Sequence, residues 1–354
     1  MNELSVLIGV VLLGALATQL SLPPIAALCH KRGWLDRPRP GKIHSRPTPR
    51  LTGVSIYLAM WLPLLGASIL LPDAMREFNA HAGVFWIGGL AILILGVIDD
   101  LHPLTSVPKL AVQIAVGSLL YWAGIGFDRL WIPFVGGLPL GLFAWPVTLM
   151  WFLIVVNAVN IIDGIDGLAA STTAVGCISL IWVSWDIQLP PVWIGAGALL
   201  GGLIIFLRYN RPPAEVFMGD SGSLSIGYFF AMVALFAPIK RFTALAFFVP
   251  ILALMLPLLE SVLSIGRRSL ARSNPLRGDT GHLHNQLQRA GLTDFQILLI
   301  YNGIAAIVGV FCVGFRFANR RILAILLGIF VLSVLVGLGI ILRRRRQDAD
   351  KSAN

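Results

Sequence analysis

Charged residues are scarce in this chain of 354 residues, where Asp, Glu, Lys and Arg together make up only 12%. Hydrophobic residues reach 57%, and the mean hydropathy is +0.83. This apolar content is more than the core of a water-soluble protein of this length requires. The composition therefore excludes a soluble protein and indicates an integral membrane protein.

Cysteine is also rare, with Cys29, Cys177 and Cys312 lying far apart in or beside apolar segments. This pattern supports neither a disulfide framework nor a cysteine metal cluster. A cleavable signal is not expected either, because the apolar stretch at 4–28 is too long and has no basic region before it. The first apolar segment should therefore remain as a helix.

Apolar runs of about 17 to 25 residues, the length that crosses a bilayer as a helix, recur along the chain. They predict an all-α, polytopic membrane protein with about eleven transmembrane helices, in which residues 1–342 form one domain and 343–354 a basic tail. The expected spans are residues 4–28, 51–71, 82–98, 108–125, 144–162, 168–185, 190–207, 223–239, 242–265, 295–315 and 321–342.

The distribution of basic residues predicts the orientation. The chain has 27 Lys and Arg against 17 Asp and Glu, a net charge of +10. When the C-terminal tail is placed in the cytoplasm, most Lys and Arg residues fall on that side, as the positive-inside rule requires. An odd number of spans then puts the N-terminus in the periplasm. A basic rim also suits anionic membrane lipids, so we prefer this explanation to nucleic-acid binding.

Five polar motifs fall on the expected cytoplasmic side, and we interpret them as parts of one site. Five aspartates gather there at the membrane boundary: Asp99, Asp100, Asp163, Asp166 and Asp220. The motifs are KIHSRPTPRLTG (42–53), DDLHPL (99–104), NAVNIIDGIDG (157–167), EVFMGDSGS (215–223) and GHLHNQ (281–286).

Asp99 and Asp100 end an expected helix, where the helix dipole disfavours carboxylates by about 0.3 to 1 kcal/mol each. A nearby cation is expected, either Lys109 or a divalent ion. A simple hydrated helix end is the alternative.

In NAVNIIDGIDG, polar residues recur every three positions and drift around a helix. Gly164 and Gly167 allow the backbone to turn, so we expect the helix to break there. Isolated carboxylates at membrane depth are costly, which favours a functional role over a polar connector.

The motif FMGDSGS marks a helix N-terminus, where Ser221 or Ser223 could serve as a simple cap. Free amides at such an end also bind phosphate, but Asp220 would repel an anion unless a metal lay between them. Mg²⁺ together with a polyphosphate satisfies both features.

The remaining two motifs are basic. His282 and His284 lack the ligand spacing of an ordinary zinc site, so phosphate contacts are the functional interpretation and incidental positions in a basic loop the alternative. Lys42 and Arg50 are open to the same two interpretations.

These motifs, in this order among eleven spans, resemble the polyprenyl-phosphate N-acetylhexosamine-1-phosphate transferases of glycosyltransferase family 4, which include WecA-like and MraY enzymes. The resemblance implies transfer of a sugar 1-phosphate from a UDP-sugar to undecaprenyl phosphate, with release of UMP and a requirement for Mg²⁺ or Mn²⁺. It also implies a bacterial inner-membrane location with the site facing the cytoplasm. A homodimer is a further expectation.

The resemblance implies roles for individual residues. Asp220 and Asn160 would hold the metal, Asp99 and Asp100 would serve the lipid phosphate, and Lys109 would meet a phosphate. The expected substrate-binding residues, some at uridine and some near the phosphates and sugar, are Lys42, Arg50, Lys109, Asn157, Asp163, Gly164, Asp166, Phe217, His282 and His284.

The segment HLHNQLQRAGLTDFQ looks more like the WecA-type branch and favours N-acetylglucosamine or another N-acetylhexosamine. Asn285 stands where the family commonly has a further histidine. An MraY-type phospho-N-acetylmuramoyl-pentapeptide transferase is the alternative within the family. A secondary transporter, whose carboxylates would bind ions at a broken helix, is the alternative from another class.

Overall fold

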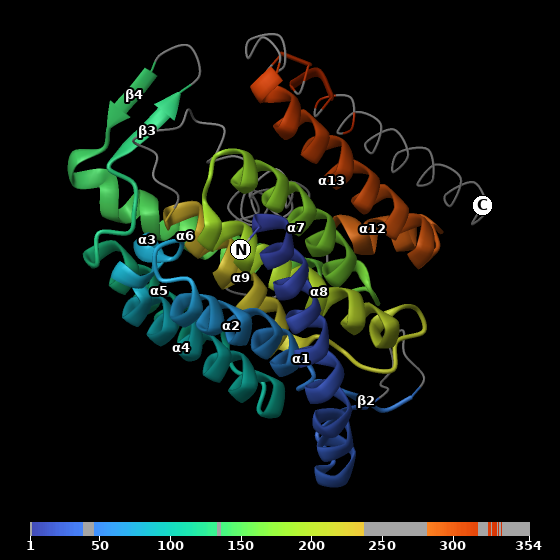
Figure 1. The fold of residues 1–354 in the computed structure, drawn as a ribbon. Coiled ribbons are helices and arrows are strands. Elements are labelled where there is room, and N and C mark those ends of the chain that lie inside the picture. Colours follow the sequence, from blue (N-terminus) through green and yellow to red (C-terminus); the bar gives the residue numbers. More distant parts are fainter. Residues whose placement is uncertain are drawn as a thin grey trace, which may run out of the picture.

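The computed structural model describes residues 2–37, 46–132, 136–236 and 282–317, together with 325–326, 328–330, 332 and 334. Helices dominate this part of the chain (Figure 1). The helices are α1 (Glu3–Arg32), α2 (Gly53–Leu70), α3 (Arg76–Ala80), α4 (Ala82–Leu101), α5 (Ser106–Trp122), α6 (Ala144–Ile162), α7 (Leu168–Asp186), α8 (Pro190–Asn210), α9 (Gly219–Phe236), α12 (Leu283–Arg289) and α13 (Asp294–Phe317), with a 3₁₀ turn, η1, at Gly141–Phe143.

Eight segments in the described ranges are helical, long and apolar enough to cross a membrane. Helix α5, with 17 residues, occupies another expected span but is one residue shorter than that criterion requires. The chain is therefore a mostly helical, polytopic membrane protein. The expected span at 242–265 and the tail at 343–354 lie outside the described residues, as does most of the span at 321–342.

Two short antiparallel strand pairs were not anticipated from the sequence. Strand β1 (Leu35–Asp36) pairs with β2 (Thr48–Pro49) after α1. Strand β3 (Arg129–Ile132) pairs with β4 (Gly136–Pro139) between α5 and α6. The two pairs lie at opposite ends of the helix bundle (Figure 1).

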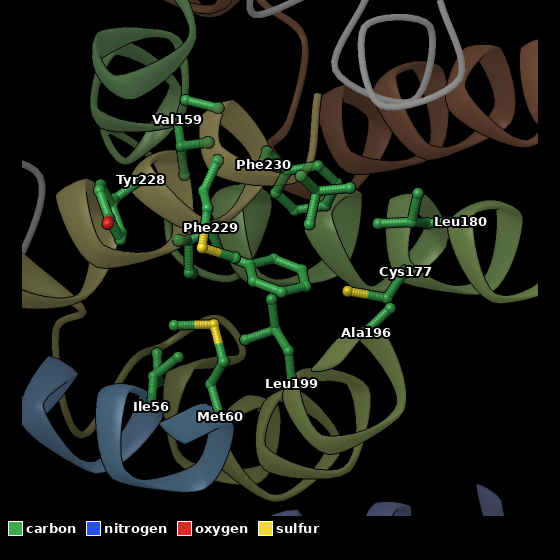
Figure 2. Close-up of a cluster of buried hydrophobic side chains, with 14 of the residues drawn as sticks. Ile56, Met60, Val159, Cys177, Leu180, Ala196, Leu199, Tyr228, Phe229 and Phe230 are labelled. Atoms are coloured by element: carbon green, nitrogen blue, oxygen red, sulfur yellow. The ribbon is translucent and has the colours of Figure 1, made fainter. Parts of the chain in front are cut away.

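Helix α9 is the central element of the bundle and is almost entirely buried. It packs against α2, α4 and α6, while α8 packs against α1, α2 and α7. Side chains from α2, α6, α7, α8 and α9 meet in one apolar cluster (Figure 2). Lipid is as apolar as these side chains, so close packing rather than the hydrophobic effect holds the helices together. This packing fixes the position of the first turn of α9.

The polar motifs meet at one end of the bundle because successive helices run in opposite directions. Asp99 and Asp100 end α4, and Lys109 lies in the first turn of α5. Asn157 and Asn160 lie in the last turns of α6, and Asp220 lies in the first turn of α9. The end that carries β1 and β2 therefore carries the candidate site as well.

Candidate active site

Lys109 joins two of the predicted aspartates. Its Nζ lies 2.8 Å from Oδ2 of Asp99 and 2.6 Å from Oδ2 of Asp220. Asp99 is buried, with a relative exposure of 9%, and its Oδ1 accepts a hydrogen bond of 2.7 Å from the backbone N–H of Leu104. The cation expected beside the α4 carboxylates is therefore Lys109, and it reaches Asp220 as well.

Asp220 is also held by Asn160. The Nδ2 of Asn160 donates to Oδ1 of Asp220 at 2.9 Å and to Oγ of Ser223 at 3.0 Å. Ser223 in turn donates to the backbone carbonyl of Gly219 at 2.9 Å. The two residues expected to bind a metal are thus neighbours, although they lie on α9 and α6.

Asp100 caps α9 from another helix. Its Oδ1 accepts the N–H of Asp220 at 2.9 Å, and its Oδ2 accepts the N–H of Ser221 at 3.0 Å. Because these two amides are engaged by an internal carboxylate, they do not form the open phosphate site that the sequence suggested. The negative charge at the positive end of the helix dipole favours this arrangement. In the structure Asp100 therefore organises the start of α9.

Two glycines let the first turn of α9 lie this close to its neighbours. A Cβ at Gly96 of α4 would stand 2.5 Å from Cα of Ser221. A Cβ at Gly53 of α2 would meet the carbonyl of Met218 and the N–H of Gly222. Neither backbone can yield without moving α9, so both positions require glycine.

The chain breaks between α6 and α7, as the NAVNIIDGIDG motif predicted. Helix α6 ends at Ile162 and α7 begins at Leu168, with Gly167 in the left-handed region at φ 75°. Asp166 accepts a hydrogen bond of 2.9 Å from the N–H of Ala214. The turn is therefore tied to the loop that precedes Asp220.

Asn210, which was not predicted from the sequence, ties the same two segments. Its Oδ1 accepts the N–H of Gly167 at 3.1 Å, and its Nδ2 donates to the carbonyl of Val216 at 2.8 Å. Asn210 is buried, with a relative exposure of 3%. Its position at the end of an apolar run, directly before a polar motif, was the sequence signal that could have identified Asn210.

Asp163 lies in the turn among other charged groups. Burial raises the pKa of its carboxyl well above the usual range, and the carboxylates of Asp220 and Asp100 raise it further. Arg50 acts on this pKa in the opposite direction, as an opposite charge should. Arg50 is thus close enough to Asp163 to act on it electrostatically, which links the basic motif before α2 to the acidic cluster.

Phe217 is anchored to the residues before α2. Its N–H donates to the carbonyl of Pro49 at 2.9 Å, and Thr52 Oγ1 donates to its carbonyl at 2.6 Å. Thr52 was not among the expected site residues. Lys42, in the same basic motif, lies outside the described residues.

The histidines approach the site from α12. His284 is buried, with a relative exposure of 2%, and its Nε2 lies 2.8 Å from the position that a Cβ at Gly164 would take. The rings of His282 and His284 are nearly parallel, with centroids 5.6 Å apart. His284 therefore lies directly on the turn that carries Asp163 and Asp166.

Asn157 pairs with Gln113, a glutamine that was likewise not predicted. Gln113 Nε2 donates to Asn157 Oδ1 at 3.2 Å, and Asn157 Nδ2 donates back to Gln113 Oε1 at 2.7 Å. Gln113 follows Lys109 by one helical turn on α5, and this spacing was the signal that could have found it. The pair fixes α5 against α6 beside the charged cluster.

The donor set at Asp220 fits a magnesium ion. Carboxylate and amide oxygens are the ligands that Mg²⁺ takes, and it usually binds through one or two carboxylates plus water and substrate phosphates. Among the described residues, no three His, Cys, Asp or Glu side chains form a complete ligand group. Asp220 and Asn160 could therefore supply only part of a coordination sphere.

Comparison with known proteins decides the family. A model described as "Glycosyl transferase family 4" matches residues 82–237, which include Asp99, Asp100, Lys109, Asn160 and Asp220. The chain is also 32% identical to the decaprenyl-phosphate N-acetylglucosaminephosphotransferase of Mycobacterium tuberculosis (strain ATCC 25618 / H37Rv), across 94% of this chain and 88% of that relative. The chain belongs to glycosyl transferase family 4.

Other members of glycosyl transferase family 4 match to different extents. The probable undecaprenyl-phosphate N-acetylglucosaminyl 1-phosphate transferase of Bacillus subtilis is 28% identical across 95% of this chain and 91% of its own length. A phospho-N-acetylmuramoyl-pentapeptide-transferase of Clostridium perfringens is 37% identical, but only across 46% of this chain and 51% of its own. Nearly full-length similarity thus extends to the N-acetylglucosamine phosphotransferases.

Proposed function

We propose that this protein transfers N-acetylglucosamine 1-phosphate from a UDP-sugar to undecaprenyl phosphate and releases UMP. The observation that carries the proposal is the convergence of Asp99, Lys109, Asn160 and Asp220 at one end of the bundle. Relatives named as prenyl-phosphate N-acetylglucosamine phosphotransferases, similar over nearly the whole chain, support this choice of substrates.

Asp220 and Asn160 would hold Mg²⁺, or Mn²⁺ in its place. When bound, the ion neutralises charge on the nucleotide pyrophosphate and lowers the barrier to attack at phosphorus. Asn160 keeps the Asp220 carboxylate in one orientation through its 2.9 Å hydrogen bond. Asp100 fixes the helix that carries Asp220.

Lys109 and Asp99 serve the lipid acceptor. The Lys109 ammonium offsets repulsion between the two phosphates that must meet. The second pKa of a phosphate monoester is about 6, so the acceptor is mostly dianionic at neutral pH. Asp99 takes the remaining proton where one is present. The acceptor oxygen then attacks the sugar-linked phosphorus, the pyrophosphate bond breaks and UMP leaves.

The remaining predicted residues bind the UDP-sugar. Gly164, Asp166 and Phe217 would cradle uridine, since hydrogen bonds tie the Asp166 turn to the loop leading to Phe217. His282 and His284 approach from α12 and would meet the phosphates and the sugar. The other proposed contributors are Lys42, Arg50, Asn157 and Asp163.

We further propose that the full chain has about eleven spans, with its N-terminus in the periplasm and its tail in the cytoplasm. The site then faces the cytoplasm of a bacterial inner membrane, where UDP-sugars are made. The reaction would begin synthesis of O-antigen or another cell-envelope polysaccharide. A homodimer is compatible with this arrangement.

The two alternatives have less support. Similarity to a phospho-N-acetylmuramoyl-pentapeptide-transferase covers less than half of this chain. Transporter sites tend to lie near the bilayer midplane, whereas Asp99, Asp100 and Asp220 lie at helix ends.

The proposal is tested with purified protein, undecaprenyl phosphate, Mg²⁺ and a panel of UDP-sugars that includes UDP-N-acetylglucosamine and UDP-N-acetylmuramoyl-pentapeptide. UMP release with UDP-N-acetylglucosamine as the preferred donor is expected. Preference for the muramoyl donor would favour the alternative within the family. If no UDP-sugar gave UMP, the transferase proposal would fail and the secondary transporter would become the favoured alternative.

A further inference from the structure

A chain of polar contacts joins helix α13 to α7. Thr172 Oγ1 donates to Oδ1 of Asn302 at 3.1 Å, and Asn302 Nδ2 donates to Oγ of Ser171 at 3.0 Å. Ser171 Oγ lies 3.3 Å from the carbonyl of Leu168, to which it donates. The hydroxyl of Thr172, the amide of Asn302 and the hydroxyl of Ser171 thus form a continuous series of hydrogen bonds. The series ends at the carbonyl of Leu168, the first residue of α7.

This chain of hydrogen bonds, which we call the α7–α13 clamp, lies close to the site. Ser171 follows Gly167 by one helical turn, and Gly167 closes the turn that carries Asp163 and Asp166. Helix α13 packs against α7 and lies on the outside of the bundle (Figure 1). Helices in lipid associate through close packing and interhelical hydrogen bonds, and a buried polar residue can fix the register between two helices.

A compact connection links the clamp to His284. Helix α12 leads directly into α13, and Gln288 Nε2 donates to Oδ1 of Asp294 at 2.7 Å across their junction. Leu287 of α12 and Ile297 and Tyr301 of α13 are fully buried. A shift of α13 along α7 would therefore carry α12 with it. A slip of one helical turn, about 5.4 Å, would remove His284 from Gly164.

We propose that Asn302 is a positioning residue that sets the register of α13 against α7 and thereby holds His284 over the Gly164 turn. Asn302 does not touch the substrate. It acts through His284, and its effect on turnover rests on the proposed function above. The clamp would let α13, which packs on the outside of the described bundle, hold His284 accurately in place.

The direct test measures the exposure of His284 without using activity. Diethyl pyrocarbonate acylates accessible imidazoles, and peptide mass spectrometry reads each histidine separately. We expect acylation of His284, relative to the exposed His102 in the same molecule, to rise about fivefold or more in Asn302→Leu, because the lost hydrogen bonds release α13. Gly303→Ala, at an open position on the same helix, should match the wild type. Unchanged acylation of His284 in Asn302→Leu would overturn the proposal.

A double-mutant cycle tests the effect on turnover. We expect Asn302→Leu to lower kcat/KM for the UDP-sugar about tenfold when His284 is present, but less than about twofold in a His284→Ala background, because coupled residues are not additive. Equal losses of kcat/KM in both backgrounds would show that Asn302 does not act through His284, and would overturn the proposal. If Asn302→Leu does not fold, Thr172→Val removes one hydrogen bond and enters the same two measurements. Failure of the proposed function would appear instead as a wild type that releases no UMP, and the labelling result would be unaffected.

Discussion

Lys109 shows how one residue connects distant parts of the sequence. Its ammonium is shared by Asp99 and Asp220, and the contact with Asp220 spans 111 positions. A cation beside Asp99 and Asp100 was predictable, because the helix dipole disfavours carboxylates at that end. The second partner was not predictable, because it depends on how α4, α5 and α9 pack. The need for a cation at this position was thus predictable from the sequence, whereas the pairing of Lys109 with Asp220 depends on the fold.

Asp163 gives a prediction about pH at the scale of one residue. Its pKa is raised in the folded protein, so ionising its carboxyl costs more free energy in the folded chain than in the unfolded chain. The free energy of unfolding should therefore fall as pH rises from about 4, the ordinary pKa, through the raised pKa of the folded protein. The fall should be about 1.4 kcal/mol for each pH unit that separates these two pKa values. Asp163→Asn should remove this part of the pH dependence.

The measurement is the melting temperature in detergent as the pH is raised from about 4, with a chelator present. Asp128→Asn, at an exposed position at the other end of the bundle, is the matched control and should follow the wild type. A wild type and an Asp163→Asn variant with parallel curves would contradict the prediction.

At the scale of an element, the start of α9 depends on Asp100. Hydropathy placed this span at 223–239, but the helix begins four residues earlier, at Gly219. The four additional residues, Gly-Asp-Ser-Gly, are not apolar, so a hydropathy pattern excludes them. They become helical because a carboxylate 120 residues away accepts the amide of Asp220. The FMGDSGS motif did predict a helix N-terminus at this point, but it did not predict that Asp100 would cap it.

Asp100→Ala should therefore destabilise the protein. The variant loses two hydrogen bonds to backbone amides, and loss of an N-cap costs about 0.5 to 2 kcal/mol. The free energy of unfolding, measured by titration with a denaturing detergent, should fall by about this amount or more. Asp128→Ala, at an exposed position, is the comparison and should be as stable as the wild type. An Asp100→Ala variant as stable as the wild type would show that the cap contributes nothing.

Other elements were more predictable from the sequence. Spans expected at 144–162 and 168–185 agree with α6 and α7 to within a residue, because the polar, glycine-containing stretch between them interrupts a long apolar run. The β3–β4 hairpin was missed. Short strands bury too little apolar surface to produce a clear alternating pattern, so composition does not reveal them.

For the whole molecule, the alternation of helix direction brings the site together. Five polar motifs scattered over the sequence were expected on one face of the membrane. In the described part of the chain these motifs do meet: Asp100 and Asn160 bond to the start of α9, and Phe217 bonds to Pro49 before α2. His284 lies against the turn after α6. The order of the spans was enough to predict this common end. It could not predict the contacts within it.

The orientation of the bundle gives a prediction at this scale. In the proposed topology Asp128 faces the periplasm and Arg211 the cytoplasm, and both are exposed. A membrane-impermeant thiol reagent applied to cells with a permeable outer membrane but an intact inner membrane should label Asp128→Cys and not Arg211→Cys. Cys29 and Cys177 are buried, and the unmodified chain gives the background. Labelling of Arg211→Cys but not of Asp128→Cys would contradict the proposed orientation and indicate the opposite one.

The central claim is that Asp220 contributes to a divalent metal site shared with the nucleotide. Binding of Mn²⁺, followed by electron paramagnetic resonance in the presence of UDP-N-acetylglucosamine, tests it most directly. We expect Asp220→Asn to weaken Mn²⁺ binding by at least about a hundredfold, since even residues that only support a metal ligand contribute roughly 10- to 100-fold. Asp128→Asn should bind as the wild type does. Equal Mn²⁺ affinity in Asp220→Asn and wild type would contradict the claim.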